Sequence, residues 1–322
     1  MKTLLLAVAL AIAGIGNAIA QPYPSRPIMI VVPVAAGGSN DTIARLLAER
    51  MRTPLGQPVI VENVTGAGGS IGVARVARAA PDGYTLSIGN WTTHVGASAV
   101  YPVSYDVLKD FEPVSRLTDT SMLIVGRNGL PAKDVKELIV WLKANPDKAS
   151  AATIGIGSPA HLCAIDFQNK TGTRFGFVPY RGGAPAIQDV VAGQVDLFCG
   201  KASNILPHVR SGAIRAYAVA SKNRWFAAPD IATMSEAGVH GMDIPFWHGL
   251  WAPKGTSKIV IARLHAAVTD AFAEPALRQR LAELGHEIPS GDLRTPEALG
   301  TFHKAEIDKW WPIIKAANIK AE

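Results

Sequence analysis

Residues 28–34 (IMIVVPV), the turn 35–41 (AAGGSND) and residues 42–51 behind it decide the fold. The first run is almost uninterrupted in apolar character, which is typical of a strand buried on both faces of a parallel sheet. After the glycine-rich turn, apolar residues such as Ile43 and Leu47 recur at helical spacing. The stretch therefore predicts a strand–turn–helix unit of an α/β protein.

The same unit recurs further along the chain. Residues 58–62 (PVIVE) predict a strand, 66–70 (GAGGS) its turn and 71–80 a helix. Residues 84–88 (YTLSI) predict a third strand, which we expect to be followed by a loop over 89–94. The first hundred residues thus predict β-α-β-α-β order with a mainly parallel sheet.

A second α/β unit begins near residue 122, and mainly helical segments follow residue 253. In the simplest layout the chain crosses to a second lobe and returns near residue 246. We predict two lobes, each a mainly parallel sheet flanked by helices, with lobe 1 formed by 21–122 and 247–322 and lobe 2 by 123–246.

The N-terminus has the features of a secretory signal peptide. Lys2 is followed by an apolar stretch over 4–15 and by the small-x-small sequence 18–20 (AIA). Residues 1–20 are therefore expected to be cleaved, which leaves Gln21 as the mature N-terminus. Because residue 21 is not cysteine, we expect a soluble, unlipidated exported protein in a bacterial periplasm.

Composition narrows the classes of partner. The formal net charge is +6, and no Lys/Arg run resembles a nucleic-acid-binding arm. Cys163 and Cys199 lack the spacing of a zinc site. A disulfide and two buried thiols both remain open for this pair, since the sequence does not give their separation. We expect no nucleic acid, no metal and no cofactor.

Four glycine- or serine-rich turns begin predicted helices, at 37–39, 66–70, 157–158 and 182–183. The start of a helix presents backbone N–H groups without internal partners, together with the positive end of the helix dipole. Glycine lets a ligand approach that backbone closely. In an open α/β sheet such turns lie where ligands bind, so the pattern predicts an anion site made of backbone amides.

Other chemistries compete for the same residues. Residues 66–72 (GAGGSIG) partly match a dinucleotide fingerprint. Within them, 68–72 (GGSIG) match the nucleophile elbow of a serine hydrolase, with Ser70 as nucleophile. His94 and His161 could serve as bases or metal ligands, or could each make one structural hydrogen bond. A structural or adhesive surface protein is a third class.

The motifs at these turns and beyond resemble the Bug family, the substrate-binding proteins of tripartite tricarboxylate transporters of the TctC type. The matching segments extend through the chain: 23–27 (YPSRP), 32–41 (VPVAAGGSND), 61–72 (VENVTGAGGSIG), 81–86 (PDGYTL), 155–162 (GIGSPAHL), 178–185 (VPYRGGAP), 192–196 (AGQVD), 228–230 (APD) and 251–253 (WAP).

The resemblance implies a two-lobed Venus-flytrap receptor, without enzymatic activity, that binds a small organic carboxylate between its lobes for uptake or sensing. It also implies membrane subunits of such a transporter as partners, and we expect a monomer. The ligand-binding residues carried over on these motifs are Gly38, Ser39, Ala67, Gly68, Gly69, Ser70, Ser158, His161, Tyr180, Arg181, Gly182, Gly183 and Ala184. The third loop of lobe 1 is expected to grip the distal end of the ligand with Trp91, Thr92, Thr93 and His94.

The chain departs from the family pattern at Gly200, where an acidic residue is common. Loss of that charge disfavours ligands with a free ammonium group. Trp91 offers an aromatic surface, so we expect a ring-bearing carboxylate in preference to a citrate-like one. Arg181 is expected either to pair with a carboxylate or to remain a solvated surface charge.

Overall fold

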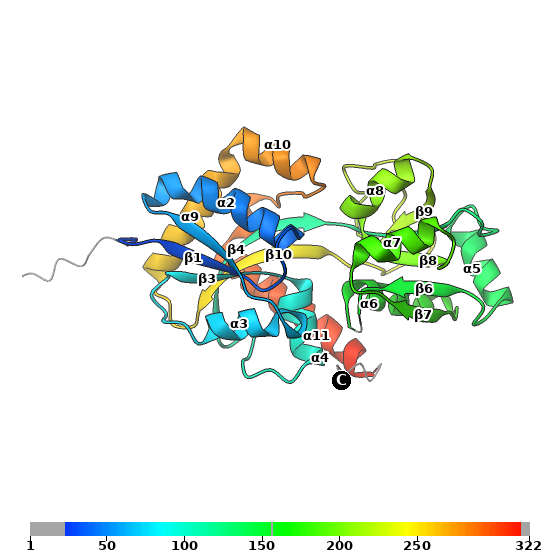
Figure 1. The fold of residues 1–322 in the computed structure, drawn as a ribbon, viewed down its shortest axis with the longest axis horizontal. Coiled ribbons are helices and arrows are strands. Elements are labelled where there is room, and N and C mark those ends of the chain that lie inside the picture. Colours follow the sequence, from blue (N-terminus) through cyan, green and yellow to red (C-terminus); the bar gives the residue numbers. More distant parts are fainter. Residues whose placement is uncertain (1–22, 156, 317–322) are drawn as a thin grey trace, which may run out of the picture.

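The computed structural model describes residues 23–155 and 157–316, which form two lobes, each built on a five-stranded sheet (Figure 1). The predicted leader peptide lies outside these residues. The first sheet has the order β2-β1-β3-β10-β4. Its strands are β1 (Ile28–Val32), β2 (Val59–Asn63), β3 (Thr85–Asn90), β4 (Phe111–Thr120) and β10 (Phe246–Pro253).

The second sheet has the order β7-β6-β8-β5-β9. Its strands are β5 (Met122–Arg127), β6 (Ser150–Thr153), β7 (Gly176–Pro179), β8 (Leu197–Lys201) and β9 (Ile214–Val219). Each sheet is mixed. The strands β5 and β10, by which the chain enters each lobe from the other, run antiparallel to both of their neighbours.

Helices cover both faces of each sheet (Figure 1). In the first lobe, α2 (Ser39–Leu55), α9 (Lys258–Ala273) and α10 (Pro275–Glu283) share one buried cluster with the sheet. The other face carries α3 (Ser70–Ala77), α4 (Ala97–Val100) and α11 (Pro296–Ala316). In the second lobe, α5 (Val135–Ala144) and α6 (Pro159–Thr171) share one cluster, and α7 (Gly183–Val191) and α8 (Ala202–Arg210) another.

Sequence and packing agree in the first unit. Ile28, Ile30 and Val32 are fully buried, and so are Ile43 and Leu47 on α2. Val31, on the opposite face of β1, is also fully buried, so the apolar run is covered on both sides. The helical spacing of α2 presents its apolar stripe to the sheet. Three short helical turns complete the fold: η1 (Ala67–Gly69), η2 (Thr92–Gly96) and η3 (Gly291–Arg294).

One strand was missed in the sequence, and one expected loop differs from the structure. β4 was not predicted, because its sequence FEPVSRLTDT has no continuous apolar run. Its charges are accommodated by a local pair, in which Arg116 Nη2 lies 2.7 Å from Asp119 Oδ2. The expected loop over 89–94 is wrong: β3 continues to Asn90, and the π-helical turn η2 begins at Thr92.

Cys163 and Cys199 form a disulfide, with their Cα atoms 6.2 Å apart. Both residues are buried. The bond joins α6 to β8 inside the second lobe, so it settles the question that the sequence left open. No helix in residues 23–155 and 157–316 is long and apolar enough to span a bilayer.

Candidate functional site

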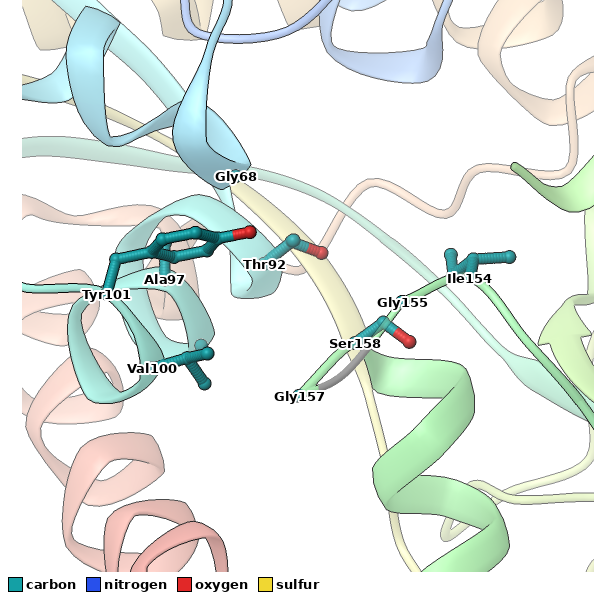
Figure 2. Close-up of a pocket in the computed structure, with 10 residues that line it drawn as sticks. Gly68, Thr92, Ala97, Val100, Tyr101, Ile154, Gly155, Gly157 and Ser158 are labelled. Carbon is teal, nitrogen blue, oxygen red and sulfur yellow. The ribbon is translucent and has the colours of Figure 1, made fainter. Parts of the chain in front are cut away.

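A cavity of about 390 Å³ lies between the two lobes, beyond the carboxyl ends of β2, β3 and β6. Figure 2 shows side chains facing this space from both sides. The first lobe contributes Gly68, Thr92, Gly96, Ala97, Val100 and Tyr101, and the second contributes Ile154, Gly155, Gly157 and Ser158. None of these described lining residues is charged.

The turn after β2 brings backbone to the cavity. Gly66, Ala67, Gly68 and Gly69 all have positive φ, with Ala67 at 44° as the one non-glycine. A Cβ on Gly69 would lie 2.9 Å from Pro33 O, so the turn packs tightly on the end of β1. Glycine is needed here for both the left-handed backbone and the close approach. Of the predicted residues in this turn, Gly68 lines the cavity.

Trp91 and His94, in the segment after β3, do not lie where the sequence predicted. Trp91 is 1% exposed and packs edge-on against Trp310. His94 is fully buried and stacks on Trp251 at 4.1 Å between ring centroids. Burial lowers the pKa of His94 well below its usual value. Both side chains are buried in the core and neither lines this cavity, which differs from the exposed, ligand-facing positions expected for them.

Thr92 and Thr93 divide the remaining roles. The Asn90 amide donates to Thr93 Oγ1 at 3.1 Å, and the Thr93 amide donates to Asn90 Oδ1 at 3.2 Å. This reciprocal pair is buried and fixes the turn. Thr92 lines the cavity instead, with its hydroxyl group toward the space between the lobes (Figure 2).

The lining residues that follow Thr92 were not among those predicted. Ala97, Val100 and Tyr101 reach the cavity from α4 and its end. Their spacing of three and four residues is that of one helical face, which would have indicated them. Gly96 joins them from the π-helical turn.

In the second lobe, Ser158 begins α6 as its N-cap. Its Oγ accepts from the His161 amide at 3.3 Å. The Gly157 amide donates to His161 Nδ1 at 3.1 Å, and the Ser158 amide donates to Gly155 O at 3.2 Å. Two of the amides expected to hold an anion are therefore used within the turn. The Ser158 hydroxyl proton remains for a ligand in the cavity.

His161 has a structural contact in this turn. Since its Nδ1 accepts from Gly157, its Nε2 carries the proton of the neutral ring. Burial lowers the pKa of His161, which favours that neutral form. Its ring packs edge-on against Phe177, with centroids 4.8 Å apart.

The turn before α7 lies outside the cavity lining. Tyr180 Oη donates to Asp189 Oδ2 at 2.6 Å, and burial and that carboxylate raise the pKa of Tyr180 to about 12. Arg181 and Ala184 are exposed, and Gly182 and Gly183 have open space where a Cβ would lie. These residues do not contact the described cavity.

The turn before α2 meets the other lobe. Gly38 is exposed, whereas Ser39 Oγ accepts from Lys201 Nζ of the second lobe at 2.7 Å. His248 Nε2 lies 3.2 Å from the same oxygen. Asp41 braces this turn, because its carboxylate accepts from the Gly37 amide at 2.9 Å and from Arg45.

Lys201 follows the Gly200 departure and was not predicted as a site residue. A Cβ on Gly200 would lie 2.2 Å from the Phe198 ring, so the strand has no room there for an acidic side chain. The next residue, Lys201, instead places an ammonium group at the carboxyl end of β8. The sequence shows only a single lysine at the end of an apolar stretch. That pattern does not indicate whether the side chain points between the lobes or into solvent.

The geometry at Ser70 does not fit a nucleophile elbow. That motif holds its serine exposed on a strained turn. Ser70 has ordinary helical φ and ψ of −62° and −28°, and it is buried. Among the described residues no histidine is hydrogen-bonded to it, and no group of His, Cys, Asp or Glu side chains could hold a metal ion.

Comparison with known proteins agrees with this arrangement. Residues 43–319 match the family model described as the tripartite tricarboxylate transporter family receptor. The chain is 36% identical over 318 residues to Protein BugT of Bordetella pertussis, which covers 98% of this chain and 97% of the relative.

Solved structures of the same type superpose over most of the chain. The periplasmic binding protein BugD is 40% identical with a TM-score of 0.78, over 93% of this chain and all of BugD. MatC from Rhodopseudomonas palustris with bound malate is 38% identical with a TM-score of 0.79, over 91% of this chain and 100% of MatC. R. palustris Rpa4515 with adipate is 31% identical with a TM-score of 0.81, over 92% and 99%. The chain belongs to the TctC family of solute receptors of tripartite tricarboxylate transporters, which includes the Bug proteins.

Proposed function

We propose that this receptor binds a small organic carboxylate in the cavity between its lobes. The observation that carries this proposal is the chemistry of the lining. Gly68, Thr92, Tyr101 and Ser158 offer backbone and hydroxyl groups, and none of the described lining residues carries a negative charge that would repel an acid. Hydroxyl and amide donors bind a carboxylate without needing a formal positive charge.

The comparisons support the same ligand class. The structures of MatC and Rpa4515 contain malate and adipate, both small organic acids. The family description supports delivery of the ligand to transporter membrane subunits. The protein acts as a receptor and not as an enzyme, which is consistent with the ordinary helical conformation of Ser70.

Ligand capture proceeds by closure of the lobes, with lobe 1 formed by 21–122 and 247–322 and lobe 2 by 123–246. These boundaries are supported by the sheets, since β4 ends at Thr120, β5 begins at Met122, and β10 begins at Phe246. A ligand that contacts Thr92 and Ser158 together stabilises the closed state. The receptor works as a monomer in the periplasm, after removal of residues 1–20.

Titration calorimetry tests this function. The purified protein is titrated with succinate, adipate, malate, citrate and benzoate, and with the methyl esters of the same acids. We expect at least one acid to bind and its ester to bind much more weakly, because esterification removes the charge. Binding of the esters with no binding of the acids would contradict a carboxylate receptor. Hydrolysis of the esters that is lost in Ser70→Ala would support an enzyme instead.

A further inference from the structure

Lys201 carries a positive charge across the boundary between the lobes. It ends β8 in the second lobe, yet its Nζ donates to Ser39 Oγ at the start of α2 in the first. The ammonium group also lies 4.1 Å from the centre of the Phe246 ring. Phe246 begins β10, where the chain re-enters the first lobe. The cation is therefore held between the lobes, close to the returning strand.

This ammonium group has no anionic partner among the described residues. Desolvation by burial lowers the pKa of Lys201 to about 8, and no carboxylate raises it again. The neighbouring titratable groups are His248 and His286, whose pKa values are lowered in part by the lysine. Burial of an unpaired charge is costly, so an incoming anion would remove an existing penalty.

Asn40, which follows Ser39 at the start of α2, has a further hydrogen-bond donor without a partner in the described part of the chain. Asn40 is 1% exposed, and its Nδ2 has no hydrogen-bond partner among the described residues. Its Oδ1 accepts from Asn90 Nδ2 at 2.8 Å, which fixes the orientation of the amide. Ser39 and Asn40 are the first residues of the long helix α2, which has no side-chain cap at Gly38. The start of this helix adds a positive potential.

Lys201 lies at the same edge of the second sheet as a residue that lines the cavity. β6 and β8 are parallel neighbours, with Ala152 paired to Phe198. Gly155, which lines the cavity, follows β6, and Lys201 ends β8. Both residues therefore emerge at the carboxyl edge of the second sheet.

We propose that Lys201, Ser39 and Asn40 form a second anion subsite that takes the second carboxylate of the ligand. The hydroxyl groups of Thr92 and Ser158 hold the first. The receptor thus selects dicarboxylates over monocarboxylates. This inference rests on the proposed function and assigns the charge preference to one side chain.

Calorimetry with matched ligands tests the subsite. The probes are succinate, glutarate, adipate and pimelate, each compared with its half-amide, which keeps the length and loses one charge. For the best diacid we expect wild type to prefer the diacid about 10-fold or more, equivalent to about 1.4 kcal/mol. Lys201→Met should abolish most of that preference while half-amide affinity stays within about threefold of wild type. Lys133→Met, an exposed lysine of the same lobe, is the matched control and should keep the preference.

Three results would overturn the subsite: an unchanged preference in Lys201→Met, an equal loss for diacid and half-amide, or a wild type that binds both probes equally. The second of these would mean that Lys201 only positions the lobes. Failure of wild type to bind any of these acids would contradict the proposed function itself, and the subsite with it.

Melting curves without ligand separate the two roles of Lys201. Removal of an uncompensated buried charge should leave the melting temperature of Lys201→Met equal to or above that of wild type. A lower melting temperature would indicate a structural link between the lobes and would contradict the subsite. Mass spectrometry of small molecules that copurify with wild type should find a compound with two acidic groups, and a monoacid would be contrary evidence.

Discussion

Trp91 and Trp310 meet edge to face, with ring centroids 5.6 Å apart and planes at 89°. Trp91 directly precedes the cavity residue Thr92, and Trp310 belongs to α11 near the end of the described chain. The turn that reaches the ligand cavity is therefore anchored by the C-terminal helix. Trp311 adds a second link, since its Nε1 donates to Val95 O at 3.1 Å.

Removal of this anchor should destabilise the first lobe. We expect Trp310→Ala to lower the free energy of unfolding by about 3–5 kcal/mol, because the ring is fully buried. Urea unfolding followed by circular dichroism measures the change. Trp91→Phe keeps an aromatic ring in place and should retain ligand affinity, because the Trp91 ring faces the core. A tenfold loss of affinity in Trp91→Phe with unchanged stability would show instead that this ring contacts the ligand.

Two serine caps offer a matched comparison of stability and binding. Ser158 caps α6 at the cavity, and Ser257 caps α9 away from it, each accepting a backbone hydrogen bond at 3.3 Å. Replacement of either by alanine should cost about 1 kcal/mol of unfolding free energy. Only Ser158→Ala should also weaken ligand binding, measured by calorimetry. Equal binding by both variants would mean that the Ser158 hydroxyl does not contact the ligand.

The disulfide should make stability depend on reductant. We expect reduction of Cys163–Cys199 to lower the free energy of unfolding by about 2–4 kcal/mol, as for loops of similar length. Thermal unfolding with and without a phosphine reductant measures the loss. The double variant Cys163→Ser, Cys199→Ser provides the control, since its melting temperature should not respond to the reductant. A wild type that melts at the same temperature in both conditions would contradict a stabilising bond.

Buried histidines should make the protein less stable in mild acid. Burial lowers the pKa of His286 and of His303 to about 4, whereas the unfolded chain titrates near 6.5. The unfolded state therefore binds more protons between these values, so stability is complete above about pH 6.5 and falls as the pH decreases toward 4. His94 and His248 act in the same direction. Asp119, whose pKa is raised by burial to about 6, opposes them in part.

Urea unfolding at about pH 7.5 and about pH 5 checks this balance. We expect a smaller unfolding free energy at the lower pH. His303→Gln should reduce the difference between the two conditions, because it removes one of the titrating rings. Equal or greater stability at the lower pH in wild type would show that the carboxylates dominate.

The elements that could be predicted are those whose structure is determined by residues close together in the sequence. The apolar run at 28–32 and the spacing of Ile43 and Leu47 determine a strand and a helix without help from distant residues. The glycine-rich turns could also be predicted from the sequence, because the positive φ angles at Gly68 and Gly69 favour glycine. Gly68, Thr92 and Ser158 were thus predicted site residues that do line the cavity.

The unpredicted parts depend on contacts between distant segments. Nothing near Trp91 in the sequence indicates that Trp310 will cover it. Trp91 was therefore predicted to be an exposed aromatic side chain, although it belongs to the core. β4 is stabilised as an edge strand by pairing with β10, more than a hundred residues later. The bond from Lys201 to Ser39 joins residues 162 positions apart, and local patterns carry no information about it.

The position of β10 between β3 and β4 has a consequence for the order of folding. All five strands of the second sheet precede residue 220, whereas the first sheet lacks an inner strand until residues 246–253 have been made. Because synthesis proceeds from the N-terminus, the sheet of the second lobe can be completed before that of the first lobe. The first lobe, which begins with β1, remains incomplete until β10 has been made. A chain truncated before β10 should therefore have a folded second lobe and an unfolded first lobe.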